Sequence, residues 1–149
     1  MRDVLLSTWA QVRAGLLTTL EKFSNEELSF RPVAKGYSVH EIALHIANEE
    51  DGEVRFGLTR ELPEFPGGFD AERYNTKSTI VGVLDEVHQR TLAYLNDLTD
   101  DDLGEMVETP WGAKSRRAEL LWHVIEHEIH HRGELSLMLG LLGREGFDA

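Results

Sequence analysis

The sequence predicts an all-α fold: a four-helix bundle of two helical hairpins joined by a longer crossover loop. Apolar residues recur every three or four positions along four long segments. Between the second and third segments, the stretch 62–74 contains two prolines and two adjacent glycines, which stop a helix. The two halves also repeat the same order of signals, including the related runs 23–28 and 98–103. A chain of 149 residues suits one domain, 1–149, with a single core.

The periodicity assigns each helix in turn. The first is expected over 4–23, with an apolar stripe at Leu5, Trp9, Val12, Leu16 and Leu20. The second begins at Ser38, where Glu41 completes a capping box, and ends near 58–61. The third is expected over 78–98 and the fourth over 115–142, with Gly143 as its stop.

Composition narrows the classes of partner. The formal net charge is -12, from 15 Lys and Arg against 27 Asp and Glu, so we expect no nucleic-acid partner. No apolar run is long enough to cross a membrane, and the first residues lack the pattern of a secretory signal, so we expect a cytoplasmic protein. Apolar surface on the bundle would allow a homodimer. Without cysteine, any metal site must use nitrogen and oxygen ligands.

Four of the seven histidines fall between positions 123 and 131. His127 and His131 occupy the apolar stripe of the fourth helix and lie one turn apart, so both rings can reach one ion. His130 shares a row with Glu126 and Glu134, where a solvated face is expected. The alternative is that the two stripe residues are buried histidines, each satisfied by a hydrogen bond.

A third ligand is expected from the second helix. His45 is flanked by the inward-facing Ile42 and Ile46, and Glu49 follows one turn later. His123, one turn before His127, is expected to serve as a substitute ligand or to support the ligands. His88 has no partner at chelating spacing and is expected to be packed or to line a pocket.

Three imidazoles leave coordination positions for water or substrate, which is typical of catalytic sites. Zn or Ni is favoured as the divalent ion, with Fe, Mn and Co also compatible with histidine ligands. Such an ion lowers the pKa of a bound water or thiol, and Glu128 or Glu49 is the candidate catalytic carboxylate that positions water. Residues 127–131 also match the H-E-x-x-H pattern of zinc peptidases, but the extended pattern fails at Glu134 and Leu137.

The segment 122–134, with His127, His131, Arg132 and Gly133, resembles the H-x-x-x-H-R-G signature of the DinB-like family, and 37–47 is similar to that family's capped second helix. The resemblance covers essentially the whole chain. It implies a four-helix bundle and the same three ligands, His45, His127 and His131. The family commonly has Gln where this chain has Glu134, which leaves the ligand assignment intact.

Relatives in the broader superfamily imply thiol-dependent S-transferases or isomerases that use low-molecular-weight thiols such as bacillithiol or mycothiol. The leading hypothesis is therefore a metal-dependent S-transferase that activates a small thiol, with a role in detoxification or stress. Two alternatives stay open. One is a metal-dependent hydrolase of a small-molecule substrate, and the other is a non-catalytic metal-binding module for stress or interaction.

Overall fold

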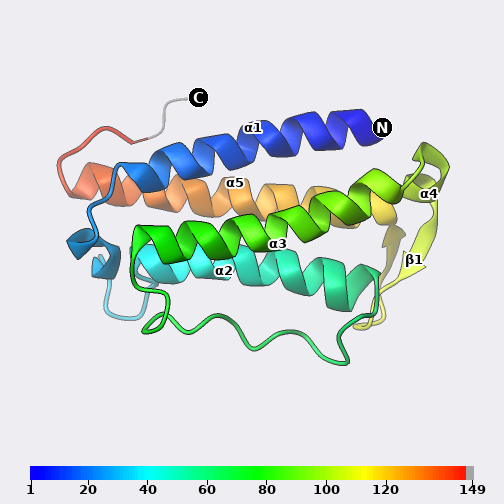
Figure 1. The fold of residues 1–149 in the computed structure, drawn as a ribbon, viewed down its shortest axis with the longest axis horizontal. Coiled ribbons are helices and arrows are strands. Elements are labelled where there is room, and N and C mark those ends of the chain that lie inside the picture. Colours follow the sequence, from blue (N-terminus) through cyan, green and yellow to red (C-terminus); the bar gives the residue numbers. More distant parts are fainter. Residues whose placement is uncertain (147–149) are drawn as a thin grey trace.

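The computed structural model describes residues 1–146, and the last three residues of the expected domain lie outside the described part. Four long helices form the bundle (Figure 1): α1 (Arg2–Glu21), α2 (Val39–Asp51), α3 (Lys77–Asp97) and α5 (Arg117–Leu141). Short elements connect them: η1 (Glu26–Ser29), the π-helix η2 (Gly52–Leu58), α4 (Asp100–Gly104), β1 (Met106–Glu108) and β2 (Lys114–Arg116). The predicted four-helix bundle is confirmed, with the expected bounds shifted by a few residues.

The order of the helices around the bundle differs from their order in the sequence. In Figure 1, α1 and α5 run in one direction, and α2 and α3 run in the opposite one. The main packing partners are α1 with α5, α2 with α3, α2 with α5, and α1 with α3. The two helices of each half are therefore antiparallel but lie diagonally across the bundle. The sequence did not predict this diagonal placement, since successive helices joined by short loops ordinarily lie side by side.

The longer crossover takes the form expected from its prolines and glycines. Residues 59–76 contain no helix and run along the outside of the bundle, back to the start of α3 (Figure 1). Phe65 packs on Gly52, where a Cβ atom would overlap the phenyl ring. Glycine at this position therefore allows the crossover to lie against the end of α2. Thr76 then caps α3 by accepting a hydrogen bond from the Thr79 amide at 3.3 Å.

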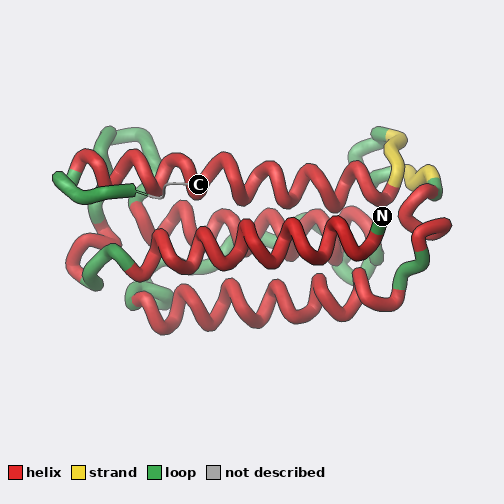
Figure 2. Tube along the Cα trace, turned by 90° about the horizontal axis from the view of Figure 1, so that it is seen from above, coloured by secondary structure: helices red, strands yellow, loops and turns green. Residues whose placement is uncertain are grey.

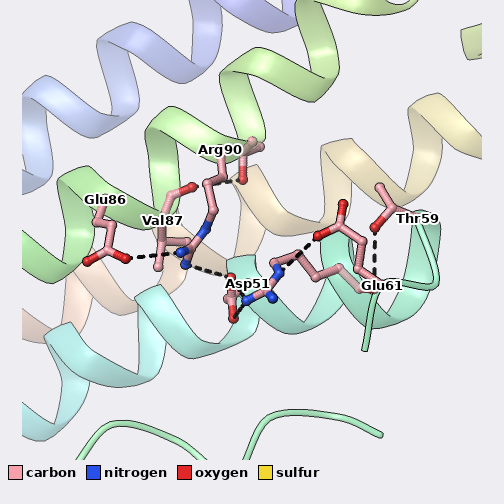
Figure 3. Close-up of polar contacts among 8 residues, drawn as sticks. Asp51, Thr59, Glu61, Glu86, Val87 and Arg90 are labelled. Carbon is pink, nitrogen blue, oxygen red and sulfur yellow. Dashed lines mark hydrogen bonds and ion pairs between the residues drawn. The ribbon is translucent and has the colours of Figure 1, made fainter. Parts of the chain in front are cut away.

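The second helix widens at its end. α2 continues directly into η2, where the Thr59 amide donates to the Val54 carbonyl, five residues back, at 2.8 Å. Ion pairs hold this junction against α3 (Figure 3): Asp51 accepts from Arg90 at 3.0 Å and from Arg55 at 3.3 Å. Arg55 also donates to Glu61, at the start of the crossover, at 3.2 Å. The wide turn is thus fixed on both sides.

A short hairpin that the sequence did not predict precedes α5. β1 and β2 are antiparallel, three residues each, and lie at the end of the bundle that holds the N-terminus (Figure 2). The expected fourth helix began two residues too early, because 115–116 belong to β2. Glu119 accepts a hydrogen bond from the Arg116 amide at 2.8 Å and so caps the start of α5. Strands this short leave no alternation that periodicity could detect.

The core has an apolar cluster toward each end of the bundle and a polar layer between them. One cluster includes Leu16, Ile46 and Leu84, and the other is built around Trp9 and Ile125. The layer consists of buried polar side chains, one from each long helix: Arg13, Glu50, His88 and Glu128. The histidines of the predicted metal site belong to the same stretches of α2 and α5 as this layer.

Candidate metal centre

Three histidines converge between α2 and α5. Their Nε2 atoms face one another, with His127 3.2 Å from His45 and 3.0 Å from His131. His131 is buried, whereas His45 and His127 are partly exposed. Because α2 and α5 pack side by side, one turn of each helix is enough to bring the rings together. The structure therefore assembles the three residues that the sequence suggested.

The spacing of these nitrogens fits one metal ion. Ligand nitrogens about 2.0–2.1 Å from a tetrahedral ion lie about 3.3 Å from one another. The observed separations of 3.0 and 3.2 Å agree with that value. Three nitrogen lone pairs that converge from a partly buried site also need a cation or protons to satisfy them. This donor set suits a divalent ion of the zinc and nickel type.

Carboxylates lie behind two of the three rings. His131 Nδ1 is 2.7 Å from Glu134 Oε2, and His45 Nδ1 is 3.8 Å from Glu49 Oε1. Both carboxylates come from the same helix as the histidine they face, three or four residues further along. Tyr37 stacks on the other side of His45, with ring centroids 5.3 Å apart. These contacts restrict the rotation of the rings and leave the Nε2 atoms facing inward.

The local electrostatics favour the neutral form of two of these rings, His127 and His45. Burial, followed by repulsion from His131 and His45, lowers the pKa of His127 to about 3. Burial also lowers the pKa of His45, although Glu49 opposes that effect. An imidazole must be neutral to donate a lone pair to a metal. At neutral pH, His127 and His45 are therefore ready to act as ligands.

Glu128, expected to position water, lies in the polar layer instead. Its Oε2 accepts hydrogen bonds from Trp9 Nε1 at 3.1 Å and Arg13 Nη2 at 2.9 Å, and the residue is 1% exposed. Burial raises its pKa, against the lowering effect of Arg13. Helical periodicity explains the difference, because Glu128 follows His127 by one residue and so points about 100° away from it. These contacts favour a structural role for Glu128, so that Glu49 is the one of the two expected catalytic carboxylates that lies next to a histidine of the cluster.

The other histidines lie outside the cluster. His123 is exposed and faces Glu53, with its Nδ1 3.9 Å from a carboxylate oxygen, so it is not among the three converging rings. His130 is exposed, as expected, and its Nε2 lies 3.5 Å from Glu134. His88 is packed, as expected, with its Nδ1 2.8 Å from Glu50 Oε1.

The ionic contacts in the polar layer were not predicted from the sequence. Arg13 Nη2 donates to Glu50 at 2.5 Å as well as to Glu128, and Nη1 donates to the Leu84 carbonyl at 3.2 Å. Burial opposes the charge of Arg13, but the two carboxylates outweigh that effect and raise its pKa. Arg13 lies one residue after Val12, at the edge of the apolar stripe, where periodicity alone favours an exposed side chain. The one available signal was the pair of acidic residues, Glu50 and Glu128, at inward-facing registers.

A cavity of about 280 Å³ lies against one histidine of the cluster. Its wall includes His45, and the crossover contributes Phe69 and its glycines. Tyr37 and Leu44 supply further apolar surface. Asn48 also lines the cavity, and its buried Oδ1 has no hydrogen-bond partner. The site thus combines three converging imidazoles with room for a small molecule.

Fold and site together define a four-helix bundle with a histidine cluster that could hold a metal ion. The chain belongs to the DinB family, whose sequence model matches residues 1–148. YjoA of Bacillus subtilis (strain 168), an uncharacterized protein, is 26% identical over 125 residues, which cover 83% of this chain and 79% of YjoA. A DinB-like protein from Bacillus cereus ATCC 10987 has a similar crystal structure, with a TM-score of 0.73, 21% identity, and coverage of 99% of this chain and 95% of that one.

Other solved structures share the fold at low identity. YfiT from Bacillus subtilis, described as a probable metal-dependent hydrolase with an unusual four-helix bundle topology, has a TM-score of 0.64 and 24% identity over 93% of this chain and 87% of its own. The mycothiol-dependent maleylpyruvate isomerase has a TM-score of 0.57 and 16% identity over 88% of this chain and 59% of that one. ClbS, a colibactin self-resistance protein solved with double-stranded DNA, has a TM-score of 0.71 and 18% identity over 93% of this chain and 95% of its own.

Two expectations about partners are affected by these findings. Over residues 1–146, no helix is both long and apolar enough to cross a bilayer. The ClbS complex means that the fold does not exclude nucleic acid, so the comparisons do not support the expected absence of such a partner. The net charge of -12 is the remaining observation against it, and the expectation stays a prediction.

Proposed function

We propose that this DinB-family chain is a metal-dependent enzyme that activates a small thiol for transfer to an electrophilic small molecule. His45, His127 and His131 are the proposed ligands. The observation that carries the proposal is the convergence of their Nε2 atoms at 3.0 and 3.2 Å beside a cavity of about 280 Å³. A divalent ion in this position would lower the pKa of a bound thiol and make its thiolate accessible near neutral pH.

The residues around the site have separate roles in this proposal. Glu49 is partly exposed, with its Oε1 3.8 Å from His45 Nδ1, and in this proposal it accepts the proton that a thiol loses. Tyr37 and Phe69 form an apolar wall that would exclude water from the reacting sulfur. In the reaction, the sulfur forms a bond to carbon of the electrophile, whose leaving group departs with its electron pair. The mycothiol-dependent isomerase, which shares the fold, supports the proposal that the substrate activated at the metal is a thiol.

Hydrolysis of a small molecule is the second candidate. The observation in its favour is again the partly exposed Glu49 carboxylate next to His45, which could orient a water molecule as readily as it accepts a thiol proton. YfiT, which shares the fold and is described as a probable metal-dependent hydrolase, supports it too. A non-catalytic metal-binding module is the third candidate, because a bundle alone does not specify chemistry.

The first test is elemental analysis of protein purified without a histidine tag. We expect about one divalent ion per chain, and its loss in His45→Ala, His127→Ala and His131→Ala. His130→Ala is the matched control, because its exposed ring lies on the same helix outside the cluster. Unchanged metal content in all three variants would refute the site.

The second test separates the three candidate functions. Protein loaded with Co²⁺ should gain a thiolate-to-metal absorption band when a small thiol is added. It should also accelerate conjugation of that thiol to monochlorobimane, with release of chloride. If the band is absent but activated esters or amides are hydrolysed, and Glu49→Gln abolishes that activity, the hydrolase is favoured. A protein that holds metal and does neither is the non-catalytic module.

A further inference from the structure

We propose that Glu134 is a positioning residue that fixes the His131 ring in its Nδ1–H form, which keeps the Nε2 lone pair directed at the other two imidazoles. The inference deepens the proposed function, because it concerns how one of the proposed ligands is prepared. It rests on geometry that exists without a metal: a distance of 2.7 Å between His131 Nδ1 and Glu134 Oε2.

The hydrogen bond between His131 and Glu134 has a defined direction. An ionised carboxylate has acceptors but no donor, so the proton between the two atoms must belong to His131 Nδ1. A neutral imidazole carries one ring proton. With that proton on Nδ1, the Nε2 atom of His131 has a free lone pair. A neutral imidazole can carry its proton on either nitrogen, and the hydrogen bond that one nitrogen makes sets which tautomer is present, so the carboxylate selects the Nδ1–H form.

The Nε2 atom of His131 faces the other two imidazoles. It lies 3.0 Å from His127 Nε2, whose own neighbour is His45 Nε2 at 3.2 Å. If His131 carried its proton on Nε2, that proton would point into the space where the three nitrogens converge, and His131 could not act as a ligand there. The contact with Glu134 therefore decides whether the third position of the site is a lone pair or a proton.

Burial and short sequence separation make the arrangement of His131 and Glu134 rigid. His131 is 7% exposed, so its ring has little room to flip. Glu134 is half-exposed and three residues further along the same helix, so the pair needs no other element to form. A carboxylate behind a metal-ligating histidine orients the ring and raises its basicity. A Gln at this position could accept the same hydrogen bond but would carry no charge.

Glu134 has one alternative use, as a direct ligand of a metal ion. His130, His131 and Glu134 also form a group whose ligand atoms lie within 4.8 Å of one another. In that case Glu134 would be a direct ligand of an outer ion, and His131 would use Nδ1 rather than Nε2. His130 would then be required, which gives the two uses opposite predictions for His130→Ala.

The first experiment uses the metal-free protein at about pH 8, where imidazoles are neutral. Nitrogen-15 correlation spectra distinguish protonated from bare ring nitrogens, and His131→Gln assigns the signals. We expect His131 to be protonated on Nδ1 in the wild type and in Glu134→Gln, and to shift toward the Nε2–H form in Glu134→Ala. An unchanged His131 in Glu134→Ala would overturn the inference, whether or not the protein binds metal.

The second experiment measures Zn²⁺ affinity by competition with a chelating dye. We expect Glu134→Ala to lose about 10-fold to 100-fold in affinity and Glu134→Gln to lose less. Glu126→Gln, on the exposed side of the same helix, is the matched control and should change nothing. Two ions per wild-type chain, with one lost in both His130→Ala and Glu134→Ala, would identify the outer site and overturn the positioning role. A wild type that binds no Zn²⁺ would refute the proposed function, while the spectra would still decide the role of Glu134.

Discussion

Replacement of Arg13 by Met should strongly destabilise the protein. The substitution keeps most of the side chain's length but removes the charge that satisfies Glu50 and Glu128, each 1% exposed. Removal of one partner from a buried ionic cluster costs about 3–5 kcal/mol, because the remaining charge is left without compensation. We therefore expect the free energy of unfolding of metal-free protein at neutral pH, measured in urea, to fall by about 3–5 kcal/mol.

The pH dependence of this loss provides a second check. Without Arg13, burial and mutual repulsion would raise the pKa of Glu50 and Glu128 in the folded state above their unfolded values. The folded variant would then bind more protons than the unfolded one, so its deficit should shrink as the pH falls toward 5. The triple variant Arg13→Met, Glu50→Gln, Glu128→Gln should recover part of the loss. Lys114→Met, which breaks an exposed pair with Glu108, should cost less than about 1 kcal/mol. A loss below about 1 kcal/mol for Arg13→Met, or a deficit that grows in acid, would refute this reasoning.

Three further outcomes are expected. In metal-free protein, the lowered pKa of His127 means that the unfolded state binds more protons than the folded state below pH 6.5, so the free energy of unfolding should fall by about 1 kcal/mol between pH 7 and pH 5, after allowance for partial exposure. The free energy of unfolding of His127→Gln should fall less over that range. An equal fall in both proteins, measured by urea titration, would contradict the assignment. Gly52→Ala should displace Phe65 and speed proteolysis within 59–76. In a Phe65→Ala background, Gly52→Ala should cause no further increase in cleavage. Unchanged cleavage of Gly52→Ala relative to the wild type would show that the contact does not hold the crossover. Because of the net charge of -12, fluorescence anisotropy should detect no binding to double-stranded DNA at physiological salt, and salt-sensitive binding would refute that prediction.

Local periodicity was enough to predict the helices and the three histidines. His127 and His131 occupy inward positions of one helix, and that spacing survives any arrangement of the other three helices. His45 could be predicted for the same reason, because the apolar residues Ile42 and Ile46 flank it in the sequence. In the structure both of these neighbours are fully buried. The pattern within a single helix indicates which side of that helix faces the core, and the predictions of the three histidines depended mainly on that information.

Features that depend on two or more helices could not be predicted in this way. The diagonal placement of successive helices follows from packing between distant segments, to which a periodic pattern is insensitive. Arg13 would have been assigned to solvent, because its burial requires carboxylates from α2 and α5 at the same level. The buried contacts of Glu128 could not be predicted for a related reason: a five-residue motif does not specify which elements its glutamate will face in the bundle.

The position of Arg13 also bears on how the chain folds. Its guanidinium contacts Glu50 of α2, the Leu84 carbonyl of α3 and Glu128 of α5, so its partners are spread over all the other long helices. A folding intermediate with only two or three helices docked would hold this cation without its full set of acceptors, and would keep it hydrated until the last helix arrived. The polar layer should therefore destabilise partly assembled bundles and make folding more cooperative. Arg13→Met should slow the final docking step less than it accelerates unfolding.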